Sequence, residues 1–403
     1  MDKKNQRPEF HGSDLEKIAA YYHIPASEIP GIIKFGANVN PLGLSESVKN
    51  DLAGHLDIIS SYPDRNYTSL KKTIGEYCHI SPEHIVVGNG STELISLLIS
   101  QRQAKKALVV GPTYSEYERE LALTGGTITE YNLKEDLNFQ LDLEDFFASM
   151  AEDVDLLILC NPNNPTGNYN SLAAMEKILA NVDCPVIMDE AYMEFADGKE
   201  LAPNDLRPMH KLWLVAGSTL SLVGRYSNLM VFRTFSKAYG LAGLRCGYAV
   251  GALGLVRQLG KALLPYHVNA FTLMAAKTVY ENKELYKERI KTIREERDKF
   301  ADCLKALGFK VWPTATNFVT FRAEGELMQQ LAKAYATKFS ERLPEQAAGG
   351  KLIFKYLLAN SILVRDFSTH PVLQGCLRIT IGLPEENKQI IAKITELCAE
   401  VKA

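Results

Sequence analysis

The sequence predicts an α/β fold, in which a large domain with a mostly parallel sheet covered by helices is joined to a smaller α+β domain. Short apolar runs bounded by Gly, Pro or Asn recur between residues 84 and 232, which is typical of strands buried on both faces of a sheet. Helix-like segments alternate with these runs, and this order favours parallel strands. A long charged amphipathic stretch, 281–307, leads to a remainder with a different pattern.

The large domain is expected over residues 56–285, with helices at 69–77 and 92–100. A further helix, 14–22, lies in an N-terminal segment, 1–55, which we assign to an arm and part of the small domain. The strands expected in the large domain are, in chain order, 84–88, 107–110, 155–160, 185–188 and 229–232.

The small domain is expected over residues 286–403, with a closing helix from Pro384. A polar, Gly-rich segment, 341–350, is expected to be a surface loop. The strands expected in the small domain lie near 309–311, 317–321, 362–365 and 377–381.

Composition excludes several classes of function. The net charge of −3 and the scattered basic residues give no electrostatic footprint for nucleic acid. No apolar run reaches the ~18 residues that suggest a membrane span, and the N-terminus lacks the apolar core of a signal peptide. The seven cysteines form no C-x-x-C pair, so neither zinc nor redox chemistry is indicated. We therefore expect a cytoplasmic protein that binds neither nucleic acid nor membrane and holds no metal.

A lysine in an unusual setting is the first candidate for chemistry. Lys237 lies in a Gly/Ala-rich turn just after the expected strand 229–232. Lysines are rarely buried without a partner, and removal from water lowers the pKa of the amine towards the nucleophilic neutral form. The hydroxyls of Thr234 and Ser236 and the guanidinium of Arg245 would form a phosphate pocket beside that amine.

Other polar segments also follow expected strands. Gly90, Ser91 and Thr92 lie at a strand-to-helix junction, where backbone N–H groups suit a phosphate. The segment 161–167, Asn-Pro-Asn-Asn-Pro-Thr-Gly, is a loop constrained by two prolines. The remaining candidates are an aromatic residue after strand 107–110 and two polar residues after strand 185–188, namely Tyr114, Asp189 and Tyr192.

These segments, taken in order, resemble pyridoxal-5′-phosphate (PLP) enzymes of fold type I, in the branch of histidinol-phosphate aminotransferases and threonine-phosphate decarboxylases. The resemblance covers about residues 11–395 and implies a sheet of the seven-stranded type. It also implies that Lys237 holds PLP as a Schiff base and that Asp189 pairs with the pyridine nitrogen. The other implied PLP contacts are stacking by Tyr114, hydrogen bonds to the 3′-oxygen from Asn164 and Tyr192, and phosphate binding by Gly90, Ser91, Thr92, Thr234, Ser236 and Arg245.

The resemblance further implies a homodimer and an anionic substrate. Tyr62 matches a family tyrosine that reaches the cofactor phosphate of the partner subunit. Arg365 and Arg378 are interior to expected strands of the small domain, where an arginine needs an anionic partner. A substrate carboxylate or phosphate would serve, and an internal salt bridge is the alternative. Asn38 and His11 match segments of the decarboxylase branch that are candidates for substrate contact.

Two reactions within this branch remain open. The segments around Lys237 and Asp189 resemble those of the aminotransferases and favour ping-pong transamination through Lys237 and pyridoxamine phosphate. The segments 11–13, 38–43 and 365–368 look more like those of the decarboxylases. A PLP-binding sensor without catalytic activity is the alternative of another class. It is disfavoured because the residues before the core show neither a basic helix pair nor a net positive charge.

Overall fold

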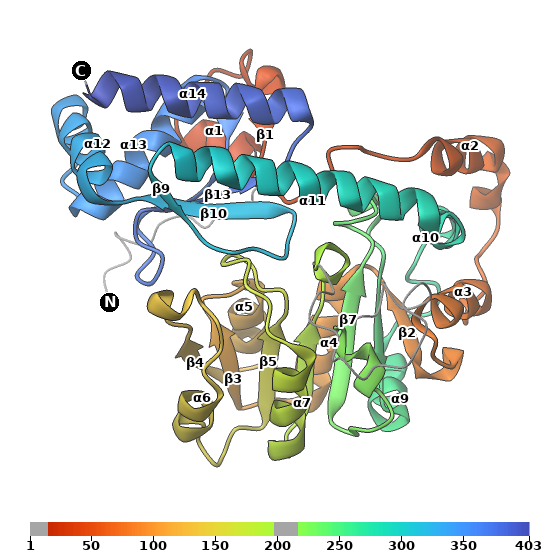
Figure 1. The fold of residues 1–403 in the computed structure, drawn as a ribbon. Coiled ribbons are helices and arrows are strands. Elements are labelled where there is room, and N and C mark those ends of the chain that lie inside the picture. Colours follow the sequence, from red (N-terminus) through yellow and green to blue (C-terminus); the bar gives the residue numbers. More distant parts are fainter. Residues whose placement is uncertain (1–14, 197–216, 403) are drawn as a thin grey trace. The chain divides into compact units, whose positions relative to one another are not determined.

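The computed structural model describes residues 15–196 and 217–402, which form two compact units (Figure 1). The large unit comprises Val39–Arg294 and Pro313–Asn317. The small unit comprises the chain up to Asn38, Glu295–Trp312 and the chain from Phe318 onwards. The predicted candidate His11 lies outside the described residues.

The large unit is built on a mixed, mostly parallel seven-stranded sheet, which confirms the predicted fold class. Only β8 runs antiparallel to its neighbours β2 and β7. The edge strand β4 was not predicted because most of its side chains are exposed and give no apolar run. In spatial order the strands are β2 (Ile85–Gly88), β8 (Gly247–Gly251), β7 (Leu229–Thr234), β6 (Val186–Asp189), β5 (Leu156–Cys160), β3 (Lys106–Gly111) and β4 (Thr127–Asn132).

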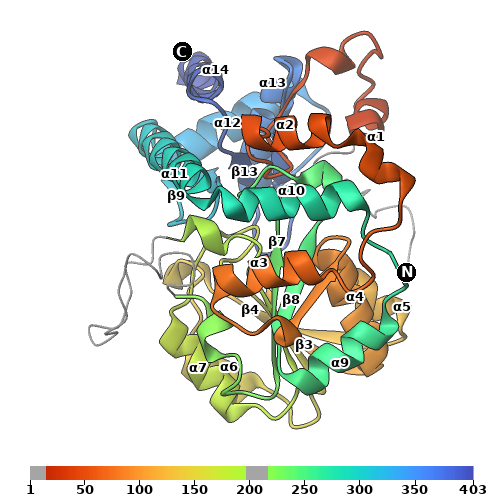
Figure 2. The same ribbon diagram turned by 90° about the vertical axis from the view of Figure 1, so that its right-hand side faces the viewer.

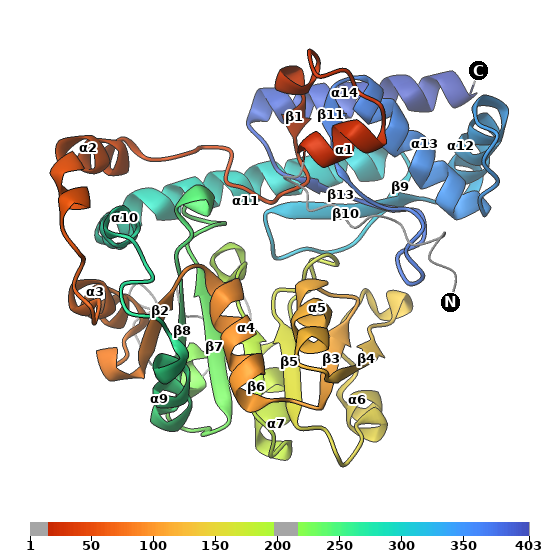
Figure 3. The same cartoon turned by 180° about the vertical axis from the view of Figure 1, so that it is seen from behind.

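Helices cover both faces of this sheet. On one face, α4, α5 and α9 pack their apolar side chains onto the strands (Figure 3), and α6 and α7 lie on the other (Figure 1). At the β2 edge, α3 packs beside α10 (Figure 2). The helices of this unit are α2 (Glu46–Gly54), α3 (Thr68–Cys78), α4 (Ser91–Arg102), α5 (Glu116–Leu123), α6 (Leu143–Ser149), α7 (Leu172–Asn181), α9 (Leu253–Ala262) and α10 (Ala270–Glu281).

The parallel strands place the predicted functional segments at one edge. β2, β7, β6, β5 and β3 all point the same way. The loops that follow them therefore meet at their carboxyl ends, which is where open α/β sheets bind ligands. Helix α2 packs on α10, so the large unit begins at Val39, earlier than the boundary at residue 55 that the sequence suggested.

The small unit has a four-stranded antiparallel sheet and a short parallel pair, β1 with β11. The closing helix α14 begins at Pro384 as predicted. The four-stranded sheet has the order β12 (Arg365–Phe367), β13 (Cys376–Thr380), β10 (Phe318–Ala323) and β9 (Phe309–Val311). The other elements are α1 (Leu15–Tyr21), β1 (Ile33–Lys34), α12 (Gly325–Lys338), α13 (Glu345–Ala359), β11 (Ile362–Leu363) and α14 (Pro384–Lys402), with the long α11 (Lys283–Ala306) leading into the unit.

The prediction of a surface loop at 341–350 is wrong in its second half. Helix α13 begins at Glu345, and its glycines Gly349 and Gly350 are buried. A Cβ atom on Gly350 would clash with the backbone of Gly375. Gly350 therefore serves a close backbone approach inside a helix, which a local reading of glycine as a turn signal does not detect.

Candidate active site

An anion-binding cradle lies at the N-terminus of α4. Gly90 precedes the helix with φ of 91°, a conformation that favours glycine. A Cβ atom at Gly90 would lie 2.5 Å from Nη2 of Arg245, so the guanidinium packs directly on this turn. Thr234 donates a hydrogen bond to Ser236 Oγ (3.0 Å), and Arg245 Nη1 donates to the same oxygen (3.3 Å). Backbone N–H groups, hydroxyls and a guanidinium thus converge on one point that suits a phosphate.

Lys237 follows β7 in a loop that is held by a hydrogen bond from the N-terminal segment of the large unit. The neighbouring carbonyl of Ala238 accepts a hydrogen bond from Asn40 Nδ2 (2.6 Å). Lys237 is half-buried, and its Nζ lies 5.9 Å from the ring centroid of Tyr192. Its positive charge also lowers the pKa of Asp189. The amine therefore lies near the Tyr192 ring and within electrostatic range of the Asp189 carboxylate.

Asp189 is a buried carboxylate at the carboxyl end of β6, in the middle of the sheet. The hydroxyl of Tyr117 donates to Oδ2 (2.6 Å), and the backbone N–H of Ala191 donates to Oδ1 (3.0 Å). Burial raises the pKa of Asp189, and these two hydrogen bonds and Lys237 act in the opposite direction. Such a carboxylate suits a cationic group of a ligand.

Tyr114 and Asn164 lie on loops that are tied together. Asn163 Nδ2 donates to the carbonyl of Pro112 (2.9 Å), and Thr113 donates to Asn163 Oδ1 (2.8 Å). These bonds join the loop after β5, which carries Asn164, to the loop after β3, which carries Tyr114. The charges of Asp189 and Arg245 both act on the pKa of the Tyr114 hydroxyl, which burial raises. Tyr114 is therefore within electrostatic range of both the Asp189 carboxylate and the Arg245 guanidinium.

Sequence reasoning missed two features of this site. Tyr117, the donor to Asp189, was not singled out as a site residue. Arg233 is fully buried and donates to Glu190 Oε2 (2.9 Å), Glu194 Oε1 (2.8 Å) and Ser218 Oγ (2.9 Å). Arg233 and Glu190 are the chain neighbours of Thr234 and Asp189, and charged residues next to site residues at strand ends are the signal that could have revealed them.

The substrate candidates of the small unit form a separate group. Arg365 and Arg378 are direct cross-strand partners on β12 and β13, and Arg378 Nη2 donates to the carbonyl of Gly36 (2.6 Å). Asn38 is buried, and its Oδ1 accepts a hydrogen bond from Thr380 (3.0 Å). Tyr62 belongs to the large unit, where it is 83% exposed.

In residues 15–196 and 217–402, no group of three or more His, Cys, Asp or Glu side chains is arranged to hold a metal ion. The helices in these ranges are all too short or too polar to cross a membrane.

A lysine, a buried carboxylate and a candidate phosphate site lie at the carboxyl edge of a seven-stranded sheet that has the fold of the large domain of fold type I enzymes. The chain belongs to the aminotransferase class I and II family, whose model matches residues 30–394. Enzymes of this family depend on PLP.

Several known proteins are similar to almost the whole chain in sequence or in structure. A histidinol-phosphate aminotransferase of Thermoanaerobacter sp. is 32% identical over 392 residues, which cover 95% of this chain and 97% of that protein. The crystal structure of the histidinol-phosphate aminotransferase from Clostridium acetobutylicum is similar with a TM-score of 0.75 and 26% identity, covering 91% of this chain and 99% of that one. The L-threonine-O-3-phosphate decarboxylase from Porphyromonas gingivalis shares the fold with a TM-score of 0.70 and 22% identity, covering 90% and 98%.

Proposed function

We propose that this protein is a PLP-dependent aminotransferase that acts on a small phosphorylated amine or amino acid, in the manner of histidinol-phosphate aminotransferases. The observation that carries the proposal is the grouping of Lys237 with Asp189 and Tyr192 at the sheet edge that also holds the cradle. The similarity to histidinol-phosphate aminotransferases over nearly the full length supports the choice of reaction.

The residues at this edge fit PLP, group by group. The absence of a side chain at Gly90 lets the Arg245 guanidinium approach the turn closely, and Ser91, Ser236 and Arg245 would offer donors to a phosphate there. Asp189 would pair with the protonated ring nitrogen, Tyr114 would stack on the ring, and Asn164 and Tyr192 would bond its 3′-oxygen. When bound, PLP withdraws electron density from the substrate Cα atom.

The chain itself supplies proton transfer and orientation. Lys237 would remove the proton from Cα of the amino donor and return it to a neighbouring carbon, acting as base and then as acid. Asp189 holds a negative charge in a buried setting, where electrostatic interactions are strong. Tyr192 flanks the amine and limits the directions from which a substrate reaches it.

The arginine pair of the small unit indicates an anionic substrate. Arg365 and Arg378 face each other across β12 and β13, and like charges directly opposite each other destabilise a sheet. An anion bound between them would remove this repulsion and accept bidentate hydrogen bonds. A phosphate or a carboxylate of the substrate would serve in this role.

The reaction is tested by mixing the purified, PLP-loaded protein with histidinol phosphate or O-phosphothreonine, one substrate at a time. We expect histidinol phosphate to remove the absorbance of the lysine-bound cofactor. The aminated form of the cofactor should appear instead and can be identified by its mass. A protein that binds no PLP would refute the proposal. So would a protein that binds PLP and converts no amine substrate.

A decarboxylase is the second candidate, because the segments 38–43 and 365–368 resemble those of threonine-phosphate decarboxylases. In that reaction the substrate carboxylate, rather than the Cα proton, leaves. Release of CO₂ from O-phosphothreonine, with the lysine-bound cofactor restored, would support this candidate against transamination.

We further propose that the protein acts as a homodimer formed through an exposed apolar surface of the large unit. This surface comprises Leu56, Ile59, Tyr62, Leu264 and Tyr266. The rings of Tyr62 and Tyr266 lie 4.8 Å apart, and the 3-10 helix η3 (Leu56–Ser60) packs on α10. Large exposed apolar patches mark interaction sites, and the resemblance of Tyr62 to a cross-subunit tyrosine favours a second copy of this chain as the occupant.

Replacing Ile59 with glutamate is expected to convert the dimer into monomers, because a charge would be buried at the apolar contact. Light scattering coupled to size-exclusion chromatography measures the mass directly. Leu123→Glu is the matched control, since Leu123 is an equally exposed leucine (73%, against 70% for Ile59) on α5. A wild-type protein that is monomeric at micromolar concentration would contradict the proposal.

A further inference from the structure

We propose that Tyr117 is a positioning residue whose hydroxyl holds the Asp189 carboxylate in place and keeps it available to the ring nitrogen of the cofactor. This inference rests on the proposed function, and it assigns a role to a residue outside the lysine, carboxylate and cradle groups.

The geometry links Tyr117 to two of the groups proposed to contact the ring. Tyr117 is 1% exposed, and its hydroxyl donates to Asp189 Oδ2 at 2.6 Å. Its own ring lies edge-on to that of Tyr114, with centroids 5.6 Å apart and an interplanar angle of 87°. Helix α5 therefore presents one side chain that contacts both the carboxylate and the stacking ring.

The hydrogen bond matters because Asp189 is almost fully buried. A carboxylate removed from water tends to take up a proton, and burial does raise the pKa of Asp189. The donors that oppose this are the Tyr117 hydroxyl on one oxygen and the Ala191 backbone N–H on the other. A hydrogen bond to a charged group in such a setting is stronger than a neutral one.

Removal of the Tyr117 hydroxyl should therefore change both the charge and the orientation of the Asp189 carboxylate. Without the Tyr117 donor, Asp189 would be protonated more readily and would be free to turn about its side-chain bonds. A neutral or turned Asp189 would no longer hold a proton on the ring nitrogen. The alternative is that Tyr117 only fills the core and satisfies its own hydroxyl, as buried tyrosines usually do.

The test compares Tyr117→Phe with the wild type, using PLP labelled with ¹⁵N in the ring. We expect the ¹⁵N resonance to move towards the unprotonated position and kcat to fall about 10- to 100-fold, the range for a lost hydrogen bond to a charged group. The substrate KM should change little, because Tyr117 contacts no proposed substrate group.

Tyr131→Phe is the matched control, because Tyr131 is also buried and also donates to an aspartate, Asp145 Oδ2 at 2.9 Å, at the far edge strand β4. It should reproduce any general loss of stability and leave kcat and the ¹⁵N resonance unchanged. In an Asp189→Asn background, Tyr117→Phe should have little further effect on either readout, because the coupled partner is gone.

The possible outcomes distinguish a failure of the proposed function from a failure of the role proposed for Tyr117. A wild-type protein that does not bind PLP overturns the proposed function. A wild-type protein that transaminates, together with a Tyr117→Phe variant whose ¹⁵N resonance is unchanged, overturns only the role of Tyr117. A fall in kcat without any change of the resonance would also overturn it, because loss of packing against Tyr114 would then be sufficient.

Discussion

Replacement of Lys237 by alanine is expected to abolish turnover and to remove the long-wavelength absorbance of the bound cofactor. The loss should be at least about 10²–10⁴-fold, the contribution of a positioned acid–base group, because the amine of Lys237 is the group proposed to transfer the proton. Steady-state kinetics and an absorbance spectrum of the PLP-loaded variant measure the two effects separately.

Lys261→Ala provides the control for this experiment. Lys261 is exposed and lies in the last turn of α9, so its removal should leave both the spectrum and kcat unchanged. If the Lys237→Ala variant keeps the absorbance band, the assignment of Lys237 as the cofactor lysine is wrong.

Replacement of Arg233 by methionine is expected to destabilise the protein by about 3–5 kcal/mol, the range for removing one partner of a buried ion pair. Arg233 bonds to both Glu190 and Glu194, and all three side chains are 0–1% exposed. Without the guanidinium, two carboxylates would remain buried beside each other. Unfolding of the PLP-free variant in urea, monitored by circular dichroism, measures the loss in the free energy of unfolding.

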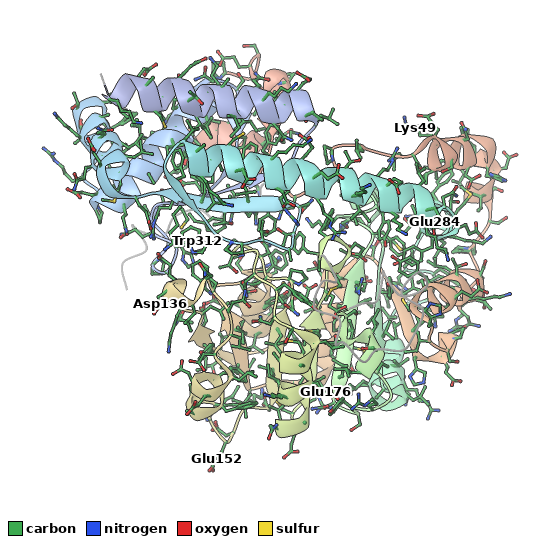
Figure 4. All side chains as sticks on the ribbon, viewed as in Figure 1. Lys49, Asp136, Glu152, Glu176, Glu284 and Trp312 are labelled. Carbon is green, nitrogen blue, oxygen red and sulfur yellow. The ribbon has the colours of Figure 1, made fainter. Side chains whose placement is uncertain are left out.

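A matched substitution tests whether burial is the cause. Arg225 forms an ion pair with Glu176 of α7, a residue labelled in Figure 4, but the two side chains are 62% and 33% exposed. Arg225→Met should therefore cost less than about 1 kcal/mol. If the two variants unfold at the same urea concentration, the buried cluster does not have the stabilising role inferred for it.

Local sequence patterns sufficed for the central strands and for the edge of the sheet at which the candidate site residues lie. The runs at 155–160, 185–188 and 229–232 became β5, β6 and β7 with small changes at their ends, because strands buried on both faces must be apolar throughout. The polar segments that follow them, including Lys237 and Asp189, could be placed at one edge because the carboxyl ends of parallel strands meet there. The roles assigned to individual side chains came from the resemblance.

Local patterns failed where distant residues decide the conformation. Gly349 and Gly350 looked like loop residues, yet both lie in α13. At Gly350 the backbone of Gly375 approaches too closely for a side chain. β8 was not predicted, because this short strand begins and ends with a glycine and follows soon after Lys237 in the sequence. Its place between β2 and β7 is set by pairing with strands far away in the chain.

The sequence by itself determined the class of fold, the edge of the sheet that carries chemistry and the residue types present there, since these follow from hydrophobic patterning and from motifs in local order. Only the tertiary structure decided which side chains bond to Asp189 and Arg233. The hydroxyl of Tyr117 and the carboxylates around Arg233 come from elements separated by tens of residues. Hydrogen bonds and ion pairs act over a few ångströms in space, and distance along the chain does not reveal them.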